Sequence, residues 1–225
     1  MFEASTEEHE EVRKTVLVKW FKPPLGWFKL NTDGSSIQHR GLAGGGGIIR
    51  DAFGNWVIGF SSRFDFTSSI MAELSALRHG LFMAKNIGVA KIVVELDAKV
   101  AVNLITNMSK AKKSMKSIVM ECKNLLQHFE EYIVQHNYRE GNRVADVLAK
   151  MGSHQVDTSA IHYHYAPPNP QVNFLFALDN MNVLTARVWR VEVYGYNHSY
   201  ACVHNPRKYV WRHYSFEFIF FLKAL

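Results

Sequence analysis

The sequence predicts an α/β fold in which a five-stranded mixed sheet is flanked by helices. Three apolar runs joined by short turns come first, which is typical of an antiparallel meander. The hydrophobic period then changes from that of strands to that of helices. Strands and helices follow in the order βββαβααβα, so the later strands are parallel and their connecting helices cover the faces of the sheet.

The first three predicted strands follow a break in the chain at "KPPLG", residues 22–26. They are "WFKLNTD" (27–33), "GGGGIIRD" (44–51), which glycines enter, and "NWVIGFS" (55–61), which follows the turn "DAFG". Short turns between them allow only antiparallel pairing.

A helical period begins at residue 69. Apolar residues recur at spacings of three and four up to a glycine stop at Gly88, which predicts a helix over 69–87; they are Ile70, Leu74, Leu77, Leu81 and Ala84. The later elements are a strand "KIVVEL" (91–96), helices "AKVAVNLITN" (98–107) and "KSIVMECKNLLQHF" (116–129), a fifth strand "YIVQHNY" (132–138) and a helix "NRVADVLAKMG" (142–152). In the last helix Asn142 is a good N-cap and Gly152 a good stop.

The flanks of this pattern differ from its centre. Residues 1–19 are polar and acidic and predict a loose lead-in, and residues 20–152 form the predicted domain. Residues 153–225 are rich in aromatic side chains but show no sustained period, so we expect a poorly structured C-terminal extension.

Composition restricts the compartment and the partners. Two cysteines, Cys122 and Cys202, and no apolar N-terminal segment indicate an intracellular protein of the nucleus or cytoplasm without a secretion signal. The longest apolar run, "FEFIFFLKAL", is too short and too charged to span a membrane, so no membrane partner is expected. The formal net charge of +6 favours an anionic partner such as nucleic acid, and we expect a monomer.

Four acidic residues lie at the ends of predicted elements. Asp33 ends the first strand, Asp97 follows "KIVVEL", and Glu73 and Asp146 lie in the first turns of helices. Parallel neighbouring strands would bring these carboxylates to one edge of the sheet, where they would repel one another unless divalent cations lay among them. Each acid taken alone could also be an ordinary turn, cap or helix N-terminal residue.

Five stretches carry a resemblance to a known family: "KLNTDGSS", "AGGGGIIRDAFGNWVIGFS", "MAELSALRHGL", "VVELDAKVAVNLI" and "YREGNRVADVLAKMG". Over about residues 20–152 the chain resembles the ribonuclease H family, specifically plant ribonuclease H-like domains related to the reverse transcriptases of non-LTR retroelements. The resemblance implies a ribonuclease H fold and hydrolysis of the RNA strand of RNA–DNA hybrids with two Mg²⁺ ions, or Mn²⁺, leaving a 5′-phosphate and a 3′-hydroxyl. It matches the family's four metal-binding carboxylates to Asp33, Glu73, Asp97 and Asp146.

The resemblance also suggests further site residues. His136 lies ten residues before Asp146, the offset of a family histidine in a mobile loop that is thought to assist product release, although it could equally be a strand histidine. Asn142 resembles an asparagine near the substrate backbone. The basic segment "SKAKKSMK" could contact the DNA backbone, or could be a solvated helix entry, through Lys110, Lys112, Lys113 and Lys116.

Other functions remain as alternatives. A retroelement-derived domain could bind nucleic acid without cleaving it, but retention of all four carboxylates favours an enzyme. The glycine run at 44–47 enters a strand and does not form a dinucleotide fingerprint, and no phosphate-cradling loop precedes a helix, which weakens a small-nucleotide site. The stretch "HYHY" at 162–165 lacks further ligands at the spacing of a zinc site.

Overall fold

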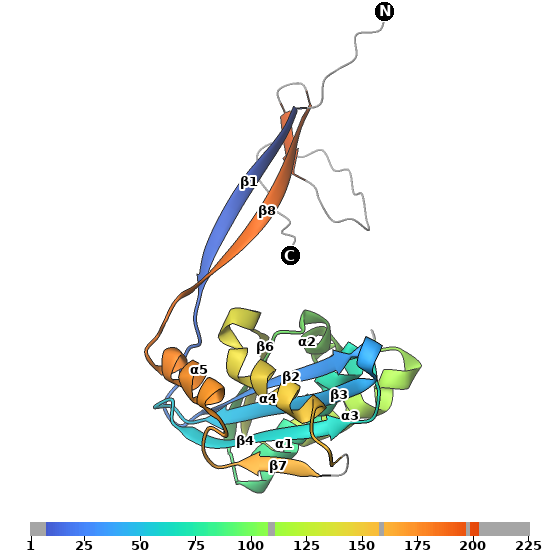
Figure 1. Cartoon of the computed structure of the whole chain (residues 1–225), viewed down its shortest axis with the longest axis vertical. Helices are drawn as coiled ribbons and strands as arrows, with labels where there is room; N and C mark the ends of the chain where they lie inside the picture. The colour runs from blue at the N-terminus through green and yellow to red at the C-terminus, as the bar shows by residue number, and fades with distance from the viewer. Residues whose placement is uncertain (1–7, 108–110, 158–159, 197–198, 203–225) are drawn as a thin grey trace, which may run out of the picture. The chain divides into compact units, whose positions relative to one another are not determined.

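The computed structural model describes residues 8–107, 111–157, 160–196 and 199–202, and the chain divides into two compact units (Figure 1). The larger unit runs from Lys19 to Val183, and the smaller unit combines residues 1–18 with residues 184–225. In the smaller unit β1 (Glu8–Val18), β8 (Thr185–Tyr196) and β9 (Ser199–Cys202) form an antiparallel sheet in the order β1-β8-β9. The prediction of a loose lead-in over residues 1–19 is therefore wrong for the part that forms β1.

The larger unit contains a mixed sheet of six strands in the order β6-β5-β2-β3-β4-β7. Its strands β2, β5 and β6 are parallel neighbours, whereas β2, β3, β4 and β7 pair antiparallel. The predicted mixed sheet and the order βββαβααβα are confirmed, and β7 is a sixth strand that the sequence did not predict. The strands are β2 (Phe28–Ile37), β3 (Leu42–Arg50), β4 (Trp56–Phe64), β5 (Lys91–Leu96), β6 (Glu131–His136) and β7 (Ile161–His164).

Helices cover both faces of this sheet, with α4 and α5 on one side in Figure 1 and α1 on the other. The helices are α1 (Ser69–Asn86), α2 (Lys99–Thr106), α3 (Lys116–Leu126), α4 (Arg143–Ser153) and α5 (Pro170–Asn180). Short 3₁₀ turns are η1 (Gln38–Arg40), η3 (Lys113–Met115) and η4 (Arg139–Gly141). None of the helices in the described ranges combines the length and the apolar character that a membrane crossing requires.

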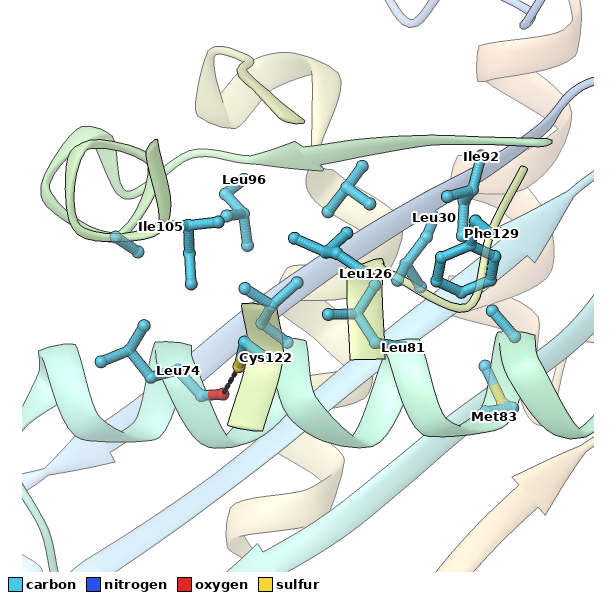
Figure 2. Packing of buried hydrophobic residues seen from close by; sticks show 14 of the residues in the cluster. Leu30, Leu74, Leu81, Met83, Ile92, Leu96, Ile105, Cys122, Leu126 and Phe129 are labelled. Atoms are coloured by element: carbon cyan, nitrogen blue, oxygen red, sulfur yellow. Dashed lines mark hydrogen bonds between the residues drawn. The ribbon is translucent and has the colours of Figure 1, made fainter. Parts of the chain in front are cut away.

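The larger of two hydrophobic clusters lies between the sheet and the helices α1 and α3 (Figure 2). Leu30 of β2, Leu81 of α1 and Leu126 of α3 meet there with almost no exposed surface. Cys122 is a free thiol in this cluster and its Sγ lies 3.7 Å from the Leu74 carbonyl oxygen. Burial raises the pKa of this thiol to about 12, so it is an apolar packing group at neutral pH.

Two glycines let helices approach the sheet closely. A Cβ on Gly34 of β2 would lie 2.2 Å from the backbone nitrogen of Glu73 in α1. On the opposite side, a Cβ on Gly46 of β3 would lie 2.3 Å from the nitrogen of Ala149 in α4. Larger residues would displace both helices, so the glycines set the depth at which α1 and α4 carry their acidic residues.

The folded unit continues beyond residue 152, where the predicted domain ends. Helix α5 forms because the Asn169 side chain accepts a hydrogen bond from the Val172 nitrogen (2.9 Å) and Pro170 occupies the first helical position. Val172 is buried against α4 and β3, and Asp179 makes a buried ion pair with Arg50 (2.8 Å). The expectation of a poorly structured extension over 153–225 is therefore wrong for β7, α5 and β8.

Candidate active site

Asp33 and Asp97 lie next to each other because of the strand register. The parallel pairing of β2 with β5 ends at Thr32 and Leu96, so each aspartate is the next residue along its strand direction. Asp33 was expected to end its strand before a turn, but β2 continues to Ile37 because its antiparallel partner β3 pairs with it from Lys29 to Ile37. The turn interpretation of Asp33 is therefore wrong.

Glu73 completes a group of three carboxylates. It lies near the N-terminal end of α1, which approaches β2 at Gly34. One ligand oxygen from each of Asp33, Glu73 and Asp97 lies within 4.8 Å of the others. An all-oxygen donor set of this size suits Mg²⁺ or Mn²⁺.

Burial and mutual repulsion change the acidity of this group. Asp33 is 7% exposed, and burial, followed by the charges of Asp97 and Asp146, raises its pKa to about 8. Burial also raises the pKa of Glu73 to about 10, with further contributions from Asp33 and Asp97. The pKa of Asp97 is raised as well, mainly by burial. The three carboxyls therefore cannot all be ionised at neutral pH unless positive charge is added among them.

Asp146 lies in the same pocket but outside the group of three. It occupies the first turn of α4, and its carboxylate makes ion pairs with Arg139 Nη2 (2.7 Å) and with Lys150. The pocket encloses about 300 Å³. Its lining contains the four predicted acids and both of these cations, together with Gly34, Ser35, Ser36 and Ser69. The structure thus brings the four predicted acids to one pocket but clusters only three of them.

Asn142 has a different role from the predicted helix cap. Its side chain makes no capping bond to α4 and instead donates a hydrogen bond to the Thr32 carbonyl oxygen (2.9 Å). Thr32 precedes Asp33, so this bond ties the start of α4 to the strand that carries the catalytic candidate. The predicted contact of Asn142 with substrate stays a prediction, and its side chain is almost completely buried.

A second tether was not predicted from the sequence. Asn137 Nδ2 donates to Glu95 Oε2 (2.8 Å) and lies 3.3 Å from the Gly141 carbonyl oxygen, which holds the turn η4 that carries Arg139. Glu95 is buried and also accepts hydrogen bonds from Lys29, Asn31 and Gln135. The sequence signal for this tether was Glu95, a glutamate within the apolar strand "KIVVEL". A buried carboxylate requires several hydrogen-bond donors, so its presence there indicates polar partners nearby.

His136 lies close to this edge of the sheet without lining the pocket. It ends β6 opposite Leu96, and its Nε2 lies 3.2 Å from the backbone carbonyl oxygen of Asp97. Its ring also meets Tyr138 edge to face, with centroids 5.5 Å apart. Its role in product release stays a prediction.

Three of the four predicted substrate-binding lysines lie in the described residues, outside the pocket lining. Lys112 precedes η3, Lys113 lies within it and Lys116 begins α3, and all three are exposed. Lys110 falls outside the described residues. Their contact with the DNA backbone stays a prediction.

Comparisons with known proteins agree with the fold and with the family resemblance. A family model described as "Reverse transcriptase-like" matches residues 31–152. A curated Arabidopsis thaliana protein named "Putative ribonuclease H protein" is 35% identical in an alignment of 147 residues that covers 63% of this chain. The match covers 24% of that protein, so the chain spans about a quarter of its length.

Two solved structures have the same fold. RNase H1 from Halobacterium salinarum superposes with a TM-score of 0.54 at 22% identity, covering 56% of this chain and 96% of that one. LC11-RNase H1 in complex with an RNA/DNA hybrid gives a TM-score of 0.52 at 23% identity, again covering 56% and 96% of the two chains. The predicted fold is confirmed.

Proposed function

The chain belongs to the reverse transcriptase-like family, and from this membership and its carboxylate site we propose that the unit Lys19–Val183 is a divalent-cation-dependent nuclease. Its proposed substrate is the RNA strand of an RNA–DNA hybrid. The curated relative is named as a ribonuclease H protein, and LC11-RNase H1 was solved with such a hybrid, which supports this substrate class.

The observation that carries the proposal is the group formed by Asp33, Glu73 and Asp97. Three carboxyls whose ligand oxygens lie within 4.8 Å of one another are an unfavourable arrangement without bound cations. In addition, Glu73 Oε2 is buried and has no hydrogen-bond partner among the described residues. A divalent cation would satisfy this oxygen, so the residues present fit Mg²⁺ or Mn²⁺.

Each residue has a distinct task in the proposed reaction. Asp33, Glu73 and Asp97 would hold one cation, and Asp146 with an oxygen of this group would hold a second. When bound, such a pair supplies an activated water and stabilises the leaving oxygen of a phosphodiester. Asn142 would fix α4 against β2 and so set the distance between Asp146 and Asp33.

A cleavage assay tests the proposal. The purified chain is incubated with a hybrid labelled in its RNA strand, with Mg²⁺ or with EDTA, and in parallel with duplex DNA and duplex RNA of the same sequence. We expect shortening of the hybrid RNA only with Mg²⁺. Binding of the hybrid without any cleavage in Mg²⁺ or Mn²⁺ would favour the non-catalytic alternative.

A further inference from the structure

Arg139 lies between two cavities at the edge of the carboxylate group. It lines the main pocket and also an adjoining cavity of about 230 Å³, whose lining includes Arg143 and Asp146. Its guanidinium pairs with Asp146, yet 65% of its side chain is exposed. Burial raises the pKa values of Asp33, Glu73 and Asp97, and the charge of Arg139 opposes this rise at all three, so its field reaches the whole group.

The backbone that carries Arg139 is fixed, although the side chain is exposed. Asn137 ties one end of the η4 turn to Glu95, and Asn142 ties the other end to the Thr32 carbonyl oxygen. Side-chain rotation can therefore move the guanidinium without moving the turn. Rotation costs one ion pair, in which the Arg139 side chain is 65% exposed and the Asp146 side chain 14% exposed.

Asp146 has two cationic partners with which a bound divalent cation would compete. Its carboxylate oxygens face Arg139 and Lys150, one on each. Coordination of a divalent cation by Asp146 would use these same oxygens. Of the two partners, Arg139 offers a planar fork of N–H donors that matches a phosphate group in two-point contact.

We infer that Arg139 binds a phosphate group of the substrate. In the cation-free protein Asp146 holds the Arg139 side chain, and Asp146 releases this side chain when it binds a divalent cation. This inference rests on the proposed function. The phosphodiester backbone of the substrate would then contact Arg139, whose side chain lines both the main pocket and the adjoining cavity.

The first arm of the test measures cation binding without nucleic acid. Mg²⁺ is titrated by calorimetry into the wild-type chain, Arg139→Gln and Arg78→Gln. Arg78 is the control because it is likewise an arginine in an ion pair, with Glu121, but lies outside the pocket. We expect Arg139→Gln to bind Mg²⁺ about twofold to fivefold more tightly, since a competing ion pair of Asp146 has been removed, and Arg78→Gln to be unchanged. Unchanged or weaker binding by Arg139→Gln would overturn the exchange.

The second arm measures hybrid binding as a function of salt, once with Ca²⁺ and once with EDTA. In Ca²⁺ the slope of log affinity against log salt should fall by about 1 for Arg139→Gln, which loses one phosphate contact. In EDTA its slope should equal that of the wild-type chain, because Arg139 is still paired with Asp146. If the slope of Arg139→Gln falls by the same amount in Ca²⁺ and in EDTA, the release step is overturned. If Arg139→Gln and the wild-type chain have the same slope in Ca²⁺, the phosphate contact is overturned.

Two further outcomes separate this inference from the proposed function and from misfolding. If the wild-type chain binds Mg²⁺ but not the hybrid, the proposed substrate and the phosphate contact both fail, while the first arm still decides whether Arg139 competes for Asp146.

If Arg139→Gln unfolds at a lower temperature than Arg78→Gln, the variant Arg139→Lys is used in its place. Lysine keeps the charge but loses the planar fork, so its salt slope should stay near the wild-type value while its affinity for the hybrid falls. An affinity equal to wild type would overturn the two-point contact.

Discussion

Asp33 combines a buried position with two neighbouring carboxylates. Replacing it with asparagine keeps the size of the side chain and removes one negative charge that would offset divalent cations. Cleavage of the hybrid should fall by several orders of magnitude, while the cation-free chain should be as stable as wild type or slightly more stable. Activity and urea unfolding measured on the same Asp33→Asn protein check both expectations.

Asp51→Asn is the matched control for this substitution. Asp51 is also an aspartate next to the sheet, but it accepts hydrogen bonds from Phe53 and Asn55 in the turn between β3 and β4, outside the pocket. Its replacement should leave cleavage unchanged. Near wild-type cleavage by Asp33→Asn would refute the catalytic assignment, and a large loss of cation-free stability would refute the repulsion.

The raised pKa of Asp33 predicts how stability depends on pH. The pKa of about 8 means that the folded chain keeps this proton up to a pH of about 8, whereas an unfolded chain releases it near 3.8, the ordinary pKa of an aspartate. Between these values the folded state binds more protons, so the free energy of unfolding of the cation-free protein should decrease as pH rises. The decrease should be on the order of a few kcal/mol.

Urea unfolding from pH 4.5 to pH 8.5 in EDTA measures this dependence. Saturating Mg²⁺ should stabilise the protein more at pH 8 than at pH 5, because cations bind the deprotonated carboxylates. Asp33→Asn should show a flatter pH profile than wild type. A profile that the substitution leaves unchanged would mean that Asp33 does not hold the proton.

At the scale of single residues, the sequence predicted which acids lie at the ends of elements, but it did not predict the side chains that contact them. The positions of Asp97 after a strand and Asp146 in a first helical turn follow from local patterns, and the structure has both. Arg139 was missed because its ion pair with Asp146 joins an irregular turn to a helix, and no period in the sequence describes such a contact.

At the scale of elements, α5 shows why the C-terminal part of the domain was missed. Its apolar residues are spread around the helix, so the sequence shows no single apolar stripe: Val172 is buried, Leu175 and Phe176 are partly buried, and Phe174 is exposed. The readable signal was local: Asn169 as N-cap followed by Pro170 at the first helical position. The end of strand β2 was predicted four residues too early. Its last residues, from Asp33 to Ile37, pair with β3 alone and carry no apolar alternation that would mark them as a strand.

Helix α5 is joined to the sheet by a buried charge, which gives a prediction for Asp179→Ala. Asp179 pairs with Arg50, whose side chain is 1% exposed and whose guanidinium carbon lies 3.7 Å from the centroid of the Trp20 ring. Removing the carboxylate would leave the arginine buried without its main counter-charge, so the free energy of unfolding should fall by about 3–5 kcal/mol. Urea unfolding measures the loss.

Glu121→Ala is the control for this pair, since it breaks the exposed ion pair with Arg78 and should cost no more than about 1 kcal/mol. The double replacement Arg50→Met with Asp179→Leu should recover much of the stability lost in Asp179→Ala, because apolar groups of similar volume can replace a buried ion pair. A loss in Asp179→Ala no larger than that in Glu121→Ala would contradict a structural role for the buried pair.

At the scale of the whole molecule, the topology places the site. The parallel pairing of β2 with β5 brings Asp33 beside Asp97, and helices from opposite faces add Glu73 and Asp146 at the same edge. The order of elements was enough to predict this convergence. The limits of the folded unit were not predictable in the same way, because they depend on contacts between residues far apart in sequence, such as Arg50 with Asp179.

The contacts inside the larger unit predict which part of the chain is sufficient for folding and activity. A chain of residues 19–183 contains both hydrophobic clusters, the pocket and the buried pair of Arg50 with Asp179. It should unfold at a temperature within a few degrees of the full chain and should cleave the hybrid at the same rate.

A chain of residues 19–152 keeps all four acids but lacks β7 and α5, so it loses the packing of Val172 and leaves Arg50 buried without Asp179. We expect it to be unfolded or to be destabilised by several kcal/mol, since the cost of the broken pair alone is about 3–5 kcal/mol. Thermal unfolding by circular dichroism and hybrid cleavage, measured on the three chains side by side, decide the matter: a stable and active 19–152 chain would show that β7 and α5 are accessory, and a 19–183 chain that fails to fold would show that the domain requires residues of the smaller unit.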